Sequence, residues 1–129
     1  MGQEVSVADI ALVGLGEIGG RFLRQALRLK ERGVRVVCAA EPAETSGRRH
    51  AREMGVPIKT LDEIVAMGPK VDVIFDLTGD PGVRRSLREL MQQTGNRHTI
   101  IAPEMMARML WAVVSEEELP VLHSDAHGY

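Results

Sequence analysis

Short apolar runs alternate along the chain with longer segments whose apolar residues recur at helical spacing. The runs have the length of strands and are rich in β-branched residues, which predicts strands buried on both faces. Strands of this kind, separated by helices, are typical of a parallel sheet in an α/β fold. The predicted strands are residues 10–13, 34–39, 56–58, 71–77 and 99–102, with 120–122 as a candidate sixth strand. The third of them contains Pro57, which suits only the end or the edge of a strand.

The segments between the predicted strands carry helix signals. Apolar residues at helical spacing predict a helix over 18–30, which Gly33 should end. A more polar segment, 48–54, predicts a thin helix on the surface. Thr60 and Glu63 have the spacing of a capping box at the start of a further helix.

A fourth helix is predicted to begin after Asp80, which can cap it, with Pro81 as its first residue. Gly95 should close this helix. We find no linker, repeat or low-complexity block that would divide the chain. The sequence therefore predicts a single domain over residues 1–129.

The segment 105–114 predicts a last helix that is apolar on most sides. Its polar strip is narrow and consists of Glu104, Arg108 and Ser115. A helix of this kind needs more cover than one face of a sheet supplies. Two interpretations stay open: ordinary packing against the edge of the sheet, or a surface for a homodimer or for docking a further domain.

The composition narrows the range of partners and locations. A net charge of −2 gives no electrostatic reason to expect nucleic acid or an anionic membrane as a partner. No apolar stretch is long enough to span a bilayer. The sole cysteine, Cys38, lies in an apolar run and is expected in the core, which suits a reducing cytoplasm. We therefore expect a soluble, cytoplasmic protein.

A glycine-rich motif follows the first predicted strand and opens the first predicted helix. In this strand–turn–helix setting the motif is typical of dinucleotide binding. The first glycine permits a tight turn, the second lets the backbone approach a pyrophosphate, and the third lets the helix pack closely. Free amides and the positive end of the helix would then face the phosphates. The predicted cofactor-binding residues are Gly14, Leu15, Gly16, Glu17, Ile18 and Gly19. The alternative is a packing turn without a ligand.

Glu41 stands at the end of the second predicted strand. In dinucleotide-binding folds, an acidic residue at this place binds the hydroxyls of the adenosine ribose and repels a 2′-phosphate. We therefore predict that Glu41 is a cofactor-binding residue and that NAD is preferred over NADP. Arg48 and Arg49 compete with this interpretation, because they would reach a 2′-phosphate if the loop folded back. A solvated helix face is the interpretation we favour for both.

The fourth predicted strand ends near the same crevice, because ligands bind outside the carboxyl ends of parallel strands. Thr78 and Gly79 follow it and are predicted to contact the cofactor. Asp76 and Asp80 resemble a pair of acid–base carboxylates. A helix cap at Asp80 and a hydrogen bond from Asp76 to a turn are the interpretations we favour.

Several of these motifs together resemble a known family. Residues 14–19, 39–42, 51–57 and 71–74 resemble the N-terminal domain of the glucose–fructose oxidoreductase and inositol dehydrogenase family. Residues 77–79 also resemble the strand end of homoserine dehydrogenases. The resemblance extends to about Pro103. It implies a Rossmann-type, doubly wound parallel sheet of strand order 3-2-1-4-5, with NAD(P) over the glycine loop.

The chain also departs from that family. Its members carry a glutamate-lysine-proline motif after the fifth strand, and the lysine is catalytic. The corresponding stretch here, 101–104, has no lysine. The lysines of the chain are Lys30, Lys59 and Lys70, and none is expected in the crevice. The family's substrate-binding domain has no counterpart in these residues, so we name no catalytic residue.

Three functions remain open at this point. The favoured one is a module that binds a dinucleotide and acts in sensing, in regulation or in holding the cofactor for a partner. The second is an NAD-dependent oxidoreductase completed by oligomerisation or by a missing substrate domain, an inference that rests on analogy. The third is a scaffold for another adenosine compound or for no ligand. We expect no metal site, although His123, Asp125 and His127 have the residue types of a small cluster.

Overall fold

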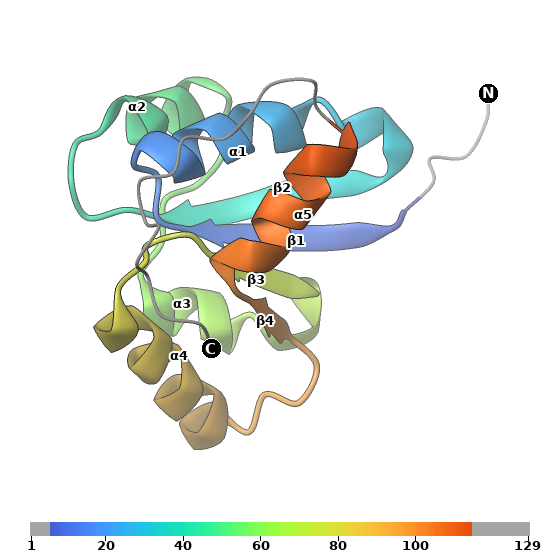
Figure 1. Cartoon of the computed structure of the whole chain (residues 1–129). Helices are drawn as coiled ribbons and strands as arrows, with labels where there is room; N and C mark the ends of the chain where they lie inside the picture. Colours follow the sequence, from blue (N-terminus) through green and yellow to red (C-terminus); the bar gives the residue numbers. More distant parts are fainter. Residues whose placement is uncertain (1–5, 115–129) are drawn as a thin grey trace.

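The computed structural model describes residues 6–114 and shows a parallel sheet with helices on both faces (Figure 1). In this part of the chain the sheet has four strands in the order β2-β1-β3-β4. The strands are β1 (Ala8–Val13), β2 (Val34–Ala40), β3 (Val73–Asp76) and β4 (Ile100–Ala102). Neighbouring strands are parallel in each pair. The predicted α/β architecture is confirmed.

The number of strands differs from the prediction. Residues 56–58 were expected to form a strand, and this is wrong, because they make a single parallel bridge between Ile58 and Ala39. Two hydrogen bonds with Ala39 flank Ile58, from Ala39 N–H to Pro57 O and from Lys59 N–H to Ala39 O. Pro57 has no N–H to extend this ladder, and a helix begins soon after at Leu61. The run nevertheless lies beside β2, where the order 3-2-1-4-5 places it. The candidate strand at 120–122 falls outside the described residues.

The helices lie in two layers because the strands between them are apolar on both faces. They are α1 (Glu17–Leu27), α2 (Ser46–Glu53), α3 (Leu61–Ala66), α4 (Pro81–Thr94) and α5 (Glu104–Val114), with short 3-10 turns at Lys30–Arg32 and Gly68–Lys70. Core residues of α1, α2 and α5 pack on one face of the sheet, and those of α3 and α4 pack on the other (Figure 1). The sheet is therefore doubly wound, as predicted.

The helix boundaries follow the capping signals. Thr60 and Glu63 form the predicted capping box at the start of α3. Asp80 caps α4 by accepting a hydrogen bond from Gly82 N–H, and Pro81 is the first residue of that helix. Helix α1 is shorter than the predicted 18–30, because the chain tightens into a 3-10 turn before Gly33 ends it.

The register of the sheet brings three loops to one edge. Val13, the last residue of β1, lies beside Ala40 of β2 on one side and Asp76 of β3 on the other. Gly14 N–H donates to Ala40 O at 2.9 Å and Leu77 N–H donates to Val13 O at 2.8 Å, so the pairing continues just past the strand ends. The segments that follow β1, β2 and β3 therefore leave the sheet side by side.

Helix α5 buries a narrow face and exposes a wide apolar one. Ala107 and Trp111, one turn apart, are buried against the sheet. Apolar residues on the outward side are exposed: Met105, Met106, Met109, Leu110, Val113 and Val114. Ile100 of the adjoining edge strand β4 is 64% exposed as well. The helix thus packs on the sheet edge and still presents an uncovered apolar surface.

Candidate functional site

A cleft of about 720 Å³ opens at the carboxyl edge of the sheet. It is lined by residues of the loops that follow β1, β2 and β3 and by the starts of α1, α3 and α4. The predicted site residues among its walls are Gly14, Gly16, Glu17, Ile18, Glu41 and Thr78. Leu15, Gly19 and Gly79 are not among its walls. The fold therefore gathers most of the predicted residues around one cavity.

The three motif glycines are needed for different spatial reasons. Gly14 has a φ of +98°, and a Cβ there would lie 2.9 Å from Thr78 Cγ2. A Cβ on Gly19 would lie within 1.8 Å of the Gly14 carbonyl oxygen, so the first turn of α1 touches the loop. A Cβ on Gly16 would meet no atom within 4 Å. Gly14 and Gly19 are therefore required by the fold, whereas the space over Gly16 belongs to the cleft.

The N-terminus of α1 has no side chain to cap it. Thr45, Thr60 and Asp80 each accept a backbone hydrogen bond at the start of α2, α3 and α4. The N-cap of α1 is Gly16, and no side-chain hydrogen bond caps this helix. The first amides of a helix have no partner within the helix and carry its positive end. Gly16, Glu17 and Ile18 line the cleft, so these amides lie beside it.

Glu41 fastens the glycine loop to the end of β2. Its Oε1 accepts a hydrogen bond of 2.7 Å from Leu15 N–H, and its Oε2 accepts one of 3.1 Å from Ala43 N–H. The Leu15 side chain points into the core and is fully buried. The amide of Leu15 is thus occupied by Glu41, while Glu41 itself remains half-buried in the cleft wall.

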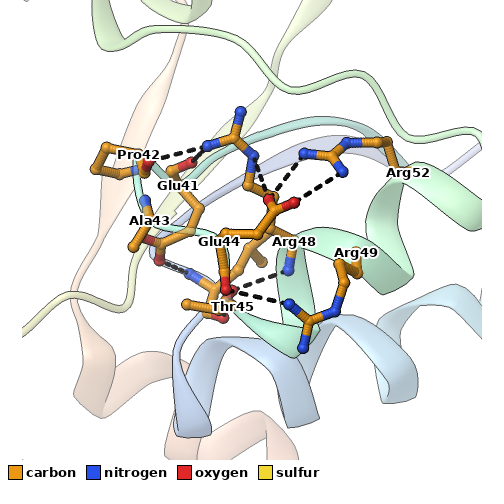
Figure 2. Close-up of polar contacts among 9 residues, drawn as sticks. Glu41, Pro42, Ala43, Glu44, Thr45, Arg48, Arg49 and Arg52 are labelled. Atoms are coloured by element: carbon orange, nitrogen blue, oxygen red, sulfur yellow. Dashed lines mark hydrogen bonds and ion pairs between the residues drawn. The ribbon is translucent and has the colours of Figure 1, made fainter.

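Arg48 folds back over the loop between β2 and α2. Its Nη1 donates to the carbonyl oxygens of Glu41 (2.8 Å) and Pro42 (3.0 Å), as Figure 2 shows. Its Nε is buried without a hydrogen bond and lies 3.6 Å from Glu44 Oε1, an ion-pair distance. Arg48 therefore lines the cleft and is partly buried, and our expectation that it belongs to a solvated helix face is wrong.

Arg49 and Arg52 complete the cluster around Glu44 (Figure 2). Arg49 Nη1 donates to Glu44 O at 3.2 Å, and both terminal nitrogens of Arg52 donate to the Glu44 carboxylate, at 2.9 and 3.2 Å. The hydrogen bonds from Arg52 lower the pKa of the Glu44 carboxyl. Arg49 is exposed and is not part of the cleft wall, as expected of a residue on a solvated face.

Thr45 and Gly47 join α2 to the glycine loop, and sequence reasoning missed both. Thr45 Oγ1 donates to Leu15 O at 2.8 Å and accepts from Arg48 N–H at 3.0 Å. A Cβ on Gly47 would lie 2.5 Å from Leu15 O and 3.1 Å from Gly20 Cα. Thr45 has the residue type of an N-cap, which is a signal that the sequence carried. The close approach at Gly47 depends on how two helices meet and leaves no local signal.

The loop after β3 is held by Asp76. This buried carboxylate accepts hydrogen bonds from Thr78 N–H (3.1 Å) and Thr78 Oγ1 (2.7 Å). Thr78 Oγ1 in turn accepts from Asp80 N–H at 3.0 Å. Burial raises the pKa of Asp76, and the hydrogen bonds from Thr78 partly offset this rise. Asp76 and Asp80 thus serve the turn and the helix cap, as favoured from the sequence, and Thr78 is fixed in the cleft wall.

Lys59 lies in the cleft wall, so our expectation that no lysine reaches the crevice is wrong. The backbone pairing of 57–59 with Ala39 carries Lys59 to the same edge as the end of β2. The hydrogen bonds with Thr60 lower the pKa of Glu63, and the positive charge of Lys59 adds to this effect. It also opposes the effect of burial on Cys38, the pKa of which is raised to about 11.

The remaining candidates lie away from the cleft. His98 stands before β4, at the opposite edge of the sheet, and its Nε2 lies 2.6 Å from Asp72 Oδ1. Within residues 6–114, no group of three or more His, Cys, Asp or Glu side chains has the arrangement of a metal site. His123, Asp125 and His127 fall outside that range. None of the described helices is long and apolar enough to cross a membrane.

Comparison with known proteins identifies solved structures that have a similar fold. No family model matches the chain, and no curated protein gives a significant sequence match. A candidate NADP oxidoreductase from Bacteroides fragilis has a similar structure, with a TM-score of 0.54 and 18% identity over 74% of this chain and 35% of the other. A homoserine dehydrogenase from Thiobacillus denitrificans gives a TM-score of 0.52 and 24% identity over 83% of this chain and 26% of the other.

These similarities concern the fold, because the sequences are distant. The chain spans 35% and 26% of the length of the two neighbours, which makes it similar to one part of each. A homoserine dehydrogenase is thus among the structural neighbours, as the resemblance at residues 77–79 implied. The chain has a Rossmann-like fold, similar to part of each of these two proteins.

Proposed function

We propose that the chain binds a nicotinamide dinucleotide in the cleft, with the pyrophosphate over Gly16. The observation that carries this proposal is the uncapped N-terminus of α1, which borders open space, whereas side chains cap α2, α3 and α4. A phosphate would accept hydrogen bonds from these amides and interact favourably with the positive end of the helix. The pyrophosphate of a dinucleotide fits this place because glycine leaves the backbone uncovered.

The same cleft favours NAD over NADP on grounds of charge. Glu41 lies at the end of β2, and each of its oxygens already accepts one backbone hydrogen bond. Each oxygen keeps a further lone pair for a ribose hydroxyl. Among the described residues, the cleft wall carries four carboxylates (Glu17, Glu41, Glu63 and Asp80) and two cations (Arg48 and Lys59). This excess of negative charge disfavours the additional phosphate of NADP.

The chemistry of the cleft supports a binding and regulatory module, or a module that holds the cofactor for a partner. Glu63 and Asp80 are engaged in helix caps, and Glu41 is engaged in the loop. Hydride transfer needs a positioned substrate and an acid–base group beside the nicotinamide. Lys59 stands on the side of the cleft beyond β2, where the adenosine would lie, so we assign it no part in hydride transfer.

An oxidoreductase completed by a second copy of the chain is the second candidate, and one observation favours it. The outward face of α5 is apolar over its whole length, with Met105 70% and Val113 81% exposed. An uncovered apolar face of this kind is typical of interaction surfaces. A second copy packed there would form a homodimer. In this homodimer each chain would complete the substrate site of the other.

Calorimetry with NADH and NADPH tests the proposed function directly. We expect both nucleotides to bind the unaltered chain, NADH more tightly. Gly16→Val should weaken NADH binding at least tenfold, or by about 1.4 kcal/mol, because the new side chain enters the space assigned to the pyrophosphate. Gly16→Ala should have the same effect in weaker form and disturb the fold less, since a Cβ there meets no atom.

The matched control is Ser86→Val, which introduces the same side chain at an exposed position of α4 outside the cleft. It should bind NADH like the unaltered chain. Thermal unfolding of all variants shows whether they are folded. Full NADH affinity in folded Gly16→Val would overturn the proposal, as would the absence of binding to the unaltered chain.

A further inference from the structure

Backbone contacts place Lys59 in the cleft, and they leave its side chain free of those contacts. Its N–H donates to Ala39 O at 2.8 Å, and the preceding residue, Ile58, forms the bridge with Ala39. Ala39 is two residues before Glu41, so the parallel alignment carries Lys59 to the end of β2. Lys59 and Glu41 both line the cleft from this side. The adenosine ribose of a dinucleotide is bound at this place in such folds.

Lys59 is partly buried as a residue and forms no ion pair with any described residue. A lysine ammonium group without a charged partner in the protein keeps its charge and its three N–H donors for an anion. Glu63 lines the same cleft, and its carboxylate is held in the capping box by Thr60. Lys59 therefore has a charge to offer to a ligand.

Arg48, the other cation of the cleft, is less available. Its Nη1 donates to two loop carbonyl oxygens, and its Nε lies at ion-pair distance from Glu44. Turning this guanidinium toward a phosphate would break both hydrogen bonds and take their donor away from the two loop carbonyl oxygens. Lys59 can bind an anion without any such loss.

We propose that Lys59 is the residue that determines how well the cleft accepts a 2′-phosphate, by binding that phosphate opposite Glu41. The inference rests on the proposed function and extends it, because it names the side chain that discriminates between the two dinucleotides. Glu41 disfavours NADP and Lys59 favours it, and the measured preference is the balance of the two. NADP binding should therefore persist as a weaker activity of the same site.

The test compares NADH and NADPH binding by calorimetry in the unaltered chain and in Lys59→Gln. Gln removes the charge and keeps the backbone contact with Ala39. We expect the ratio of the Kd for NADPH to the Kd for NADH to rise about tenfold, the loss of one charge-assisted contact to phosphate. Lys59→Arg should restore most of the original ratio, since it keeps the charge.

The matched control is Lys70→Gln, which removes the same charge at an exposed residue of the 3-10 turn Gly68–Lys70, outside the cleft. It should leave the ratio unchanged, so a general effect of net charge would show itself. NADPH binding should also weaken with added salt more steeply in the unaltered chain than in Lys59→Gln, because an ionic contact is screened.

The outcomes separate the two proposals. If the unaltered chain binds NADH and the ratio is the same in folded Lys59→Gln, the role of Lys59 is overturned and the proposed function stands. An equal change in Lys59→Gln and Lys70→Gln also overturns it, because the effect would then be one of overall charge. If the unaltered chain binds neither nucleotide, the proposed function is overturned and the role of Lys59 with it.

Discussion

Glu41 holds the glycine loop and is also the proposed ligand of the ribose. These roles are compatible, because a carboxylate has about four acceptor sites, of which Leu15 N–H and Ala43 N–H use two. The bond with Leu15 fixes the loop in the conformation in which the first amides of α1 border the cleft. The residue that selects the ribose would thus also shape the place of the pyrophosphate.

Substitutions at Glu41 separate its two roles. We expect Glu41→Ala to lower the free energy of unfolding by about 1–3 kcal/mol, because it leaves the Leu15 N–H without its acceptor. Glu41→Gln keeps an oxygen for that N–H and should cost less. Both variants lose the negative charge, so both should bind NADPH more tightly relative to NADH.

Urea unfolding measures the first effect and calorimetry measures the second. Equal stability of Glu41→Ala and the unaltered chain would show that the Leu15 hydrogen bond contributes nothing. A ratio of affinities that stays the same in both variants would remove Glu41 from the ribose.

The relation between α1 and α2 matters at the scale of elements. The two helices approach at Gly20 and Gly47, where a Cβ on Gly20 would lie 3.4 Å from Gly47 Cα. Thr45 adds a hydrogen bond from the start of α2 to the carbonyl oxygen of Leu15. Helix α2 therefore supports the glycine loop, and we expect a change in the position of α2 to alter the conformation of the loop.

Gly47→Ala tests this support. Its Cβ would lie 2.5 Å from Leu15 O, a distance that backbone atoms must shift to relieve. We expect a loss of about 1–3 kcal/mol in the free energy of unfolding from overpacking, together with weaker NADH binding. Ser46→Ala, at the exposed neighbouring position on the same helix, is the control and should change neither. If Gly47→Ala is as stable and binds as well as Ser46→Ala, the close approach of the helices has no influence on the loop.

Local signals allowed much of these elements to be predicted. The capping box at Thr60, the cap at Asp80 and the glycine motif involve neighbours in the sequence, so the sequence alone indicates them. The position of Lys59 follows from a single bridge between segments 19 residues apart, and the pattern of apolar residues does not reveal it. The contacts of Arg48 with the loop after β2 could not be predicted from the sequence for a similar reason, because they depend on the path of that loop.

At the scale of the whole molecule, the order of the four observed strands was predictable from the resemblance and from the buried apolar runs, whereas the expected fifth and sixth strands are not confirmed. The packing of helix α5 on the sheet was harder to predict. The apolar pattern of α5 left core packing and an interaction surface equally open. In the structure Ala107 and Trp111 are buried while the opposite face is exposed, so core packing explains one face only. The residue types alone cannot separate the two faces, because both are apolar.

The apolar face of α5 leads to a prediction about the oligomeric state. We expect the unaltered chain to form a homodimer through this face, with a mass by light scattering of twice the 14.2 kDa of one chain. A helix of this length is about 16 Å long at 1.5 Å per residue. One face of so short a helix offers less area than the roughly 800 Å² per partner that a stable interface buries. The dimer should therefore dissociate on dilution.

Met109→Lys places a charge in the middle of this face and should give a monomer at every concentration, because burying an unpaired ammonium group is costly. Gln93→Lys adds the same charge at an exposed position of α4 and should leave the dimer intact. If the unaltered chain is a monomer even at high concentration, α5 is not a self-association surface. The second candidate function then loses the observation that favours it. Dinucleotide binding is unaffected, because it depends on the glycine loop after β1 and on the start of α1.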